Sequence, residues 1–183
     1  MGMSSPVYYT ADMVRALPDD GKRYETVYGE LLVTPAPRLW HQEIVKRLLV
    51  MLESYLQREG VGHVLASPAD ISWGPDNLVQ PDIFVASTAE VRTLDWSQVQ
   101  TLLLAVEVVS PTTARHDRFT KRRLYQEVGI PEYWVVDPDA ETVEVWSPEA
   151  TFPTTSTGRV EWRPTGAASP FTVDLKTLFR PIA

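Results

Sequence analysis

The sequence predicts an α/β fold of the mixed α+β kind, in which helices flank a mixed central sheet. Three observations lead to this prediction. A strand, a helix and a second strand follow one another over residues 102–137, the order of a parallel βαβ unit. Turn signals between short apolar runs indicate antiparallel hairpins, and a long helical stripe covers residues 38–59. With 183 residues in total, we expect a single domain over 1–183.

The composition is that of a globular protein, with 44% hydrophobic and 22% charged residues. The absence of cysteine excludes a disulfide scaffold and thiolate-bound zinc. We find no secretory h-region and no apolar run of membrane-spanning length, so we expect a cytoplasmic protein. The net charge of −7 counts against a broad, non-specific nucleic-acid binder. It is compatible with a cluster of carboxylates that holds cations.

The N-terminal third predicts a short helix, a hairpin and a long helix: Tyr8–Leu17, Arg23–Val27 with Glu30–Thr34, and Arg38–Glu59. Thr10 is a suitable N-cap for the short helix, and Pro18 stands just past its end. Tyr28-Gly29 is a turn signal between the two strands. Gly60 follows the last residue of the long helical stripe and is a typical helix stop.

The remainder predicts six strands: His63–Ala66, Ala69–Trp73, Leu78–Val85, Leu102–Ser110, Tyr133–Asp137 and Glu141–Trp146. A helix over Asp117–Val128 ends at Gly129, and Thr88–Gln100 is expected to be helical in part. After Ser147 we expect two further short strands and a terminal segment, Val173–Phe179. The strands on either side of the helix should be parallel, and the earlier hairpins should form an antiparallel part of the same sheet.

Two carboxylates interrupt apolar strands. Glu107 stands in the middle of LLLAVEVVS, and Asp82 stands in VQPDIFVAS. A buried carboxylate is costly unless it is paired, protonated or bound to a metal. If the two strands are neighbours, strand alternation lets the two side chains converge. The alternatives are a salt bridge or a neutral acid at Glu107, and an ordinary strand-start residue at Asp82.

A lysine on the following helix is the third unusual residue. Lys121 begins the helical stripe that faces the sheet, and Asp117 lies one turn before it. Either the two form a surface pair, or Lys121 points at the two acids. Arg115, Arg118 and Arg122 fall on another face, where they contact phosphates or simply form the solvated side. Two inward acids and an inward lysine fit Mg²⁺-assisted phosphate chemistry.

These residues lie in motifs that resemble a known family. The motifs are YETVYGEL at 24–31, QPD at 80–82, VEVVSPT at 106–112, DRFTKRRLY at 117–125 and GIPEYWVVDP at 129–138. Together with the region around His41, they resemble the Uma2 family, endonucleases of the PD-(D/E)XK superfamily. The resemblance covers roughly Thr10 to Trp146, and it implies a restriction-endonuclease-like fold.

The resemblance also implies a metal centre. It implies that Asp82, Glu107 and Val108 are ligands of Mg²⁺ or Mn²⁺. In the superfamily motif a lysine stands two residues after the second acid, and here that position is Val109. The sequence departs from the pattern at this position, and Lys121 is the natural substitute.

Four further residues belong to the expected site. Glu25, in the N-terminal motif, is a candidate third catalytic acid. His41, Gln80 and Asp117 are candidate auxiliary residues. His41 has an alternative role, a histidine at a helix start that is held by local hydrogen bonds.

Three functional hypotheses follow, in order of preference. The first is a Mg²⁺-dependent endonuclease that hydrolyses DNA phosphodiester bonds, with a homodimer as a plausible assembly for cutting a duplex. The second is a catalytically inactive module on a nuclease fold, which binds nucleic acid or a protein partner. Val109 in the motif position and the net charge of −7 motivate it. The third is a purely structural role for the buried acids, held by arginines.

Overall fold

A six-stranded sheet forms the centre of the protein in the computed structural model, which describes residues 7–182. Residues 1–6 and 183, which the single-domain prediction includes, lie outside the described residues. The strand order is β10-β9-β8-β7-β6-β3. The bounds are β3 His63–Ala66, β6 Ile83–Ala86, β7 Leu102–Val108, β8 Tyr133–Asp137, β9 Thr142–Trp146 and β10 Thr154–Ser156. This confirms the predicted mixed α+β class with a mixed central sheet.

The strand β7 lies in the middle of this sheet because almost all of its side chains are apolar and both of its faces are covered. It pairs in parallel with β8, where Glu107 stands opposite Val135. It pairs antiparallel with β6, where Ile83 stands opposite Val106. The helix between β7 and β8 is the predicted crossover, so the βαβ unit is confirmed.

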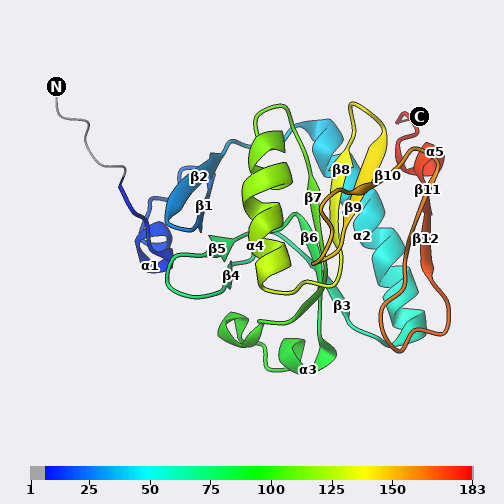
Figure 1. Cartoon of the computed structure of the whole chain (residues 1–183), viewed down its shortest axis with the longest axis horizontal. Coiled ribbons are helices and arrows are strands. Elements are labelled where there is room, and N and C mark those ends of the chain that lie inside the picture. Colours follow the sequence, from blue (N-terminus) through cyan, green and yellow to red (C-terminus); the bar gives the residue numbers. More distant parts are fainter. Residues whose placement is uncertain (1–6, 183) are drawn as a thin grey trace.

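The two faces of the central sheet are covered by different elements, as Figure 1 shows with α2 and α4 on opposite sides of the strands. The long helix α2 (Leu39–Glu59) covers one face, together with the hairpin of β11 (Arg159–Trp162) and β12 (Phe171–Asp174). The other face packs against α4 (Arg122–Glu127) and a second, smaller sheet.

The smaller sheet corrects two predictions. Its order is β2-β1-β5-β4, with the bounds β1 Arg23–Val27, β2 Glu30–Thr34, β4 Ile71–Ser72 and β5 Leu78–Val79. The N-terminal hairpin therefore does not join the central sheet. The predicted strand Leu78–Val85 is also wrong, because β5 and β6 belong to different sheets. Pro81 lacks an N–H for a ladder, and the chain leaves one sheet and enters the other across Gln80–Asp82.

The helices keep their predicted places with altered ends. Helix α1 (Ala11–Arg15) is shorter than predicted, and its Thr10 cap is confirmed by a 3.2 Å hydrogen bond from the Met13 amide. Helix α2 ends at Gly60, whose φ of 70° needs a residue without a Cβ. The predicted helix Asp117–Val128 opens as a π-helix, η2 (His116–Lys121), before it continues as α4.

The predicted partly helical segment contains α3 (Thr88–Val91) and a 3₁₀ turn, η1 (Trp96–Gln98). After Ser147 three strands are present instead of the expected two, and α5 (Leu175–Leu178) lies within the predicted terminal segment. None of the helices in the described part of the chain combines the length and the apolar character that a membrane span requires.

Candidate functional site

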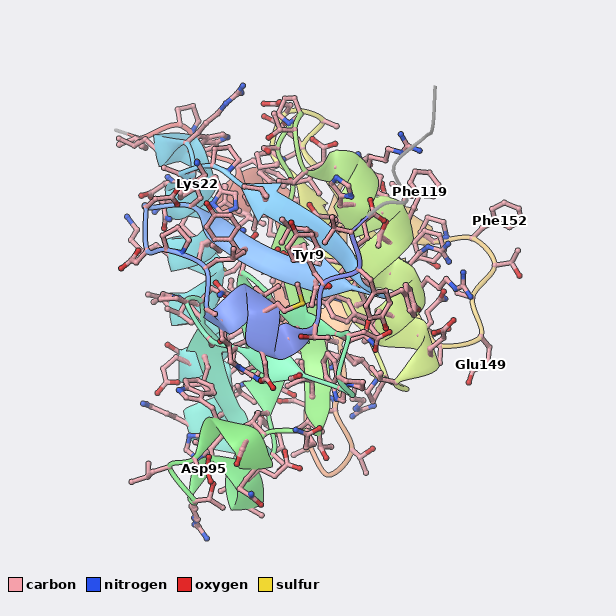
Figure 2. All side chains as sticks on the ribbon, turned by 90° about the vertical axis from the view of Figure 1, so that its left-hand side faces the viewer. Tyr9, Lys22, Asp95, Phe119, Glu149 and Phe152 are labelled. Carbon is pink, nitrogen blue, oxygen red and sulfur yellow. The ribbon has the colours of Figure 1, made fainter. Side chains whose placement is uncertain are left out.

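A cavity of about 300 Å³ lies where β7 ends and β6 begins. Its walls are the loop after β2, the start of α2 and the segment from Ser110 to Lys121. Figure 2 shows why these elements meet, since the hairpin β1–β2 lies between α2 and α4 in front of the central sheet. The cavity thus receives side chains from two sheets and two helices.

Asp82 is held at the floor of this cavity by three contacts. It directly precedes β6, so continuing the β6–β7 register places it opposite Glu107. Its Oδ1 accepts a hydrogen bond from Arg23 Nη1 at 2.6 Å. Its Oδ2 lies 3.0 Å from His41 Nε2 and accepts from the Val108 amide at 2.9 Å. Burial alone would raise the pKa of Asp82, but the contacts with His41, Arg23 and Val108 hold it below its usual range.

Glu107 points to the opposite face from Val106 and Val108, as strand alternation requires. Its side chain is 2% exposed. The Oε1 atom accepts hydrogen bonds from Lys121 Nζ at 3.0 Å and from Tyr125 Oη at 2.9 Å. Burial raises the pKa of Glu107 well above its usual value, although the Lys121 charge opposes the rise. In this arrangement Glu107 binds a proton readily and gains from a nearby cation.

Lys121 is the buried cation of the site. Its Nζ lies 2.8 Å from Glu25, 3.0 Å from Glu107 and 3.6 Å from Asp117. Burial by itself would lower the pKa of Lys121, but the three carboxylates raise it above its usual value. The lysine is located at the end of the π-helical turn, a distortion that is frequent at functional sites. Val109, in the expected lysine position, is buried among apolar side chains.

Glu25 is fully buried on β1, and only one of its carboxylate oxygens has a partner. Oε1 contacts Lys121 and accepts from the Gln80 amide at 2.7 Å, whereas Oε2 has no hydrogen-bond partner. Within residues 7–182, the buried side-chain polar atoms without a partner are Glu25 Oε2, His41 Nδ1 and Gln80 Oε1. All three belong to residues at or next to the cavity, which indicates a site that lacks a ligand's polar groups.

The cluster holds four carboxyl groups and two permanent cations: Glu25, Asp82, Glu107 and Asp117, with Arg23 and Lys121. With every acid ionised and His41 neutral, four negative and two positive charges leave a surplus of two negative charges. Burial also raises the pKa of Asp117 to about 6, with Lys121 opposing. A divalent cation would balance the surplus.

The donor set fits Mg²⁺ or Mn²⁺. No three His, Asp or Glu side chains among the described residues form a ready metal cage. Mg²⁺ does not need one, because it binds one or two carboxylates and completes its octahedron with waters and phosphate oxygens. Asp82 and the Val108 backbone line the cavity, and Glu107 is buried directly beside them, so these three residues supply oxygens of that kind.

The structure brings together most of the predicted residues. Six of these side chains lie in two adjacent groups, which are Asp82 with His41, and Lys121 with Glu25, Glu107 and Asp117. The groups adjoin where the amide of Val108, the residue after Glu107, donates to Asp82. The auxiliary residue Gln80 contributes its backbone amide to Glu25, while its side chain turns to Asp70. The contact of His41 with Asp82 favours the site role of this histidine over local hydrogen bonding at the helix start.

Two residues of the cluster escaped the sequence reasoning. Arg23 contacts Asp82, and Tyr125 donates to Glu107. Arg23 stands two residues before Glu25 in the same strand. Because side chains alternate between the two faces of a strand, the sequence could have predicted that Arg23 and Glu25 point to the same side. Arg118 does not line the cavity, and its side chain pairs with Asp137 and Glu144 instead.

Comparisons with known proteins identify the family and a solved structure with the same fold. The family model "Uma2: Putative restriction endonuclease" matches residues 11–169. A crystal structure described as "a putative nuclease belonging to DUF820" from Anabaena variabilis ATCC 29413 has the same fold, with a TM-score of 0.77. The two chains are 21% identical in sequence, and the match covers 93% of this chain and 97% of the other. The comparison with curated proteins finds no match.

Proposed function

Because the chain belongs to the Uma2 family, described as "Putative restriction endonuclease", we propose that it is an endonuclease that uses Mg²⁺ or Mn²⁺ to hydrolyse DNA phosphodiester bonds. The observation that carries the proposal is the buried cluster beside the cavity, in which four carboxyl groups share two cations and Glu25 Oε2 has no hydrogen-bond partner. A wholly structural cluster would be expected to pair its charges and polar atoms completely.

Asp82, Glu107 and the Val108 backbone would hold the metal. When bound, the ion lowers the pKa of a water and offsets negative charge on the phosphate. The protein's own part is to keep both acids fixed in the cavity. The Val108 amide and His41 Nε2 hold one oxygen of Asp82, and the Tyr125 hydroxyl holds one oxygen of Glu107. These contacts pre-position the carboxylates and limit rotation away from the cavity.

Lys121 supplies fixed positive charge. Its three carboxylate neighbours raise its pKa, so it stays an ammonium and is unsuited to take a proton as a general base. An ammonium beside the reacting phosphate donates hydrogen bonds and stabilises the charge that develops there. In this proposal Lys121 performs the task of the motif lysine, although it comes from the next helix.

Cleavage of plasmid DNA with Mg²⁺ or Mn²⁺ tests the proposal. We expect Asp82→Asn and Glu107→Gln to reduce cleavage at least about 100-fold, because each removes a charge that supports the reaction. The matched control is Asp137→Asn, which changes an acid at the end of the neighbouring parallel strand. Asp137 pairs with Arg118 and caps a turn, so its variant should cleave normally. Full activity in both site variants, with chelator-sensitive activity in the wild type, would contradict the proposed site.

The second candidate function is a catalytically inactive module that binds nucleic acid or a protein partner. The observation that favours it is Val109 in the motif position. The same assay separates the two functions, since an inactive module binds labelled DNA without cleaving it in either metal. The homodimer remains a prediction, which sedimentation of the purified chain tests.

A further inference from the structure

Arg23 covers the solvent side of Asp82. Its side chain is 24% exposed, whereas that of Asp82 is 4% exposed. Arg23 lines the cavity of the site and also a second cavity of about 300 Å³, which shares the loop 35–37, His41 and Asp82 with the first. The guanidinium therefore lies beside two open spaces and has room to move away from the carboxylate.

The two oxygens of Asp82 have unequal numbers of donors. Oδ2 has two, the Val108 amide at 2.9 Å and His41 Nε2 at 3.0 Å, and these are fixed by β7 and α2. Oδ1 has Arg23 Nη1 at 2.6 Å. A cation that binds Asp82 in the cavity would therefore take Oδ1, the atom that Arg23 now holds.

The guanidinium keeps its charge when it leaves Asp82, since arginine stays protonated in proteins. Within residues 7–182, its hydrogen bonds come from Nη1 alone, to Asp82 and to the Gln80 carbonyl at 3.3 Å. The Nε and Nη2 donors are thus available for another acceptor. A phosphodiester suits them, because two of its oxygens match the planar fork of an arginine.

We propose that Arg23 is a phosphate-binding residue of this site, which pairs with Asp82 until a divalent cation takes Oδ1 and then binds the substrate's phosphodiester. The inference rests on the proposed nuclease function and adds a residue to it. Two consequences follow. Arg23 and the metal compete for Asp82, and Arg23 contributes to DNA binding only when metal is present.

Mn²⁺ titration followed by electron paramagnetic resonance tests the competition without relying on cleavage. We expect Arg23→Gln to bind Mn²⁺ about ten-fold more tightly than the wild type, because a charged hydrogen bond to Asp82 no longer has to be broken. Arg38→Gln is the matched control. Arg38 lines the same cavity and is exposed, so its variant removes one positive charge without touching Asp82.

Anisotropy of a fluorescein-labelled DNA duplex, with Ca²⁺ and with chelator, tests the phosphate contact. We expect Arg23→Gln to weaken binding about ten-fold in Ca²⁺ and to leave it unchanged in chelator. Any loss in Arg38→Gln should be the same in both conditions. Arg23→Lys, which keeps a cation beside Asp82 but loses the planar fork, serves as the second variant if Arg23→Gln does not fold, and we expect it to bind DNA more weakly than the wild type in Ca²⁺.

The outcomes distinguish the inference from the proposed function. If neither the wild type nor Arg23→Gln binds Mn²⁺, the metal-dependent function is wrong, and the inference with it. If the wild type binds Mn²⁺ and Arg23→Gln binds it no more tightly, or if Arg23→Lys binds DNA as tightly as the wild type in Ca²⁺, the inference alone is overturned. Equal tightening in Arg38→Gln overturns it as well, because a general charge effect then explains the change.

Discussion

The two faces of the central sheet have opposite characters. On the α2 face, Leu104 and its neighbours form an apolar cluster between the strands, the helix and the C-terminal hairpin. On the α4 face, an apolar cluster of similar extent surrounds the charged residues Glu107 and Lys121. Alternate residues of the same strand β7 serve the two faces, with Val106 and Val108 on one side and Glu107 on the other.

The difference shows how stability and reactivity are divided in this fold. Apolar burial stabilises at any pH, because nothing in it titrates. Buried charges add little net stability and are costly when a partner is removed. We therefore expect apolar packing on the α2 face to contribute most of the stability. This stability would offset the cost of burying charged residues on the α4 face. Three substitutions test this division, from the largest expected effect to the smallest.

The largest effect is expected on the apolar face. Leu104 of β7 is fully buried and belongs to the same apolar cluster as Leu48 of α2. Leu104→Ala should lower the free energy of unfolding by about 3–5 kcal/mol, with the same loss at pH 5 and pH 8. Urea unfolding at the two pH values measures this. The control Phe152→Ala removes a ring that is 82% exposed and should change stability by about 0.5 kcal/mol or less. A loss of stability that depends strongly on pH would contradict the expectation that the α2 face stabilises the protein independently of pH.

On the charged face, Lys121→Met should cost about 3 kcal/mol at pH 8 and less at pH 5. The substitution leaves three buried carboxylates without their cation, and the pKa values of Glu107 and Asp117 rise further in the folded protein because Lys121 no longer opposes the effect of burial. A folded state that binds more protons than the unfolded state loses stability as the pH rises. The same urea experiment measures the effect, with Lys46→Met as the exposed-lysine control. An equal cost at both pH values would show that Lys121 acts mainly through packing.

The smallest expected effect is an increase in stability, from a substitution of Asp117. Burial raises the pKa of Asp117 from 3.8 to about 6, so its contribution to stability is present below pH 4 and is lost as the pH rises through 6. Asp117→Asn should remove this loss and make the protein about 1–2 kcal/mol more stable at pH 8, with little change at pH 4. The pH dependence of the melting temperature measures it, and the exposed Asp139→Asn is the control. A destabilised Asp117→Asn at pH 8 would mean that its contact with Lys121 outweighs its burial.

Prediction from the sequence succeeded where the signal was local. The period of α2, its stop at Gly60 and the βαβ order over β7 and β8 all depend on residues close in the chain. The predicted strand Leu78–Val85 failed because Pro81 redirects the chain, and only packing decides that its two halves join different sheets. The π-helical turn at His116–Lys121 also has no local signature in the sequence.

For the candidate site, the sequence by itself determined that Asp82 and Glu107 are carboxylates in apolar surroundings and that Lys121 lies on the inward face of its helix. The tertiary structure decided that Glu25, His41 and Arg23 join them, since these contacts cross up to 96 residues of chain, the separation of Glu25 and Lys121. It also decided that the Lys121 ammonium contacts Glu25, Glu107 and Asp117 together. The physical reason is that periodicity fixes which way a side chain points within its own element, whereas the packing of two sheets and two helices fixes which side chains meet.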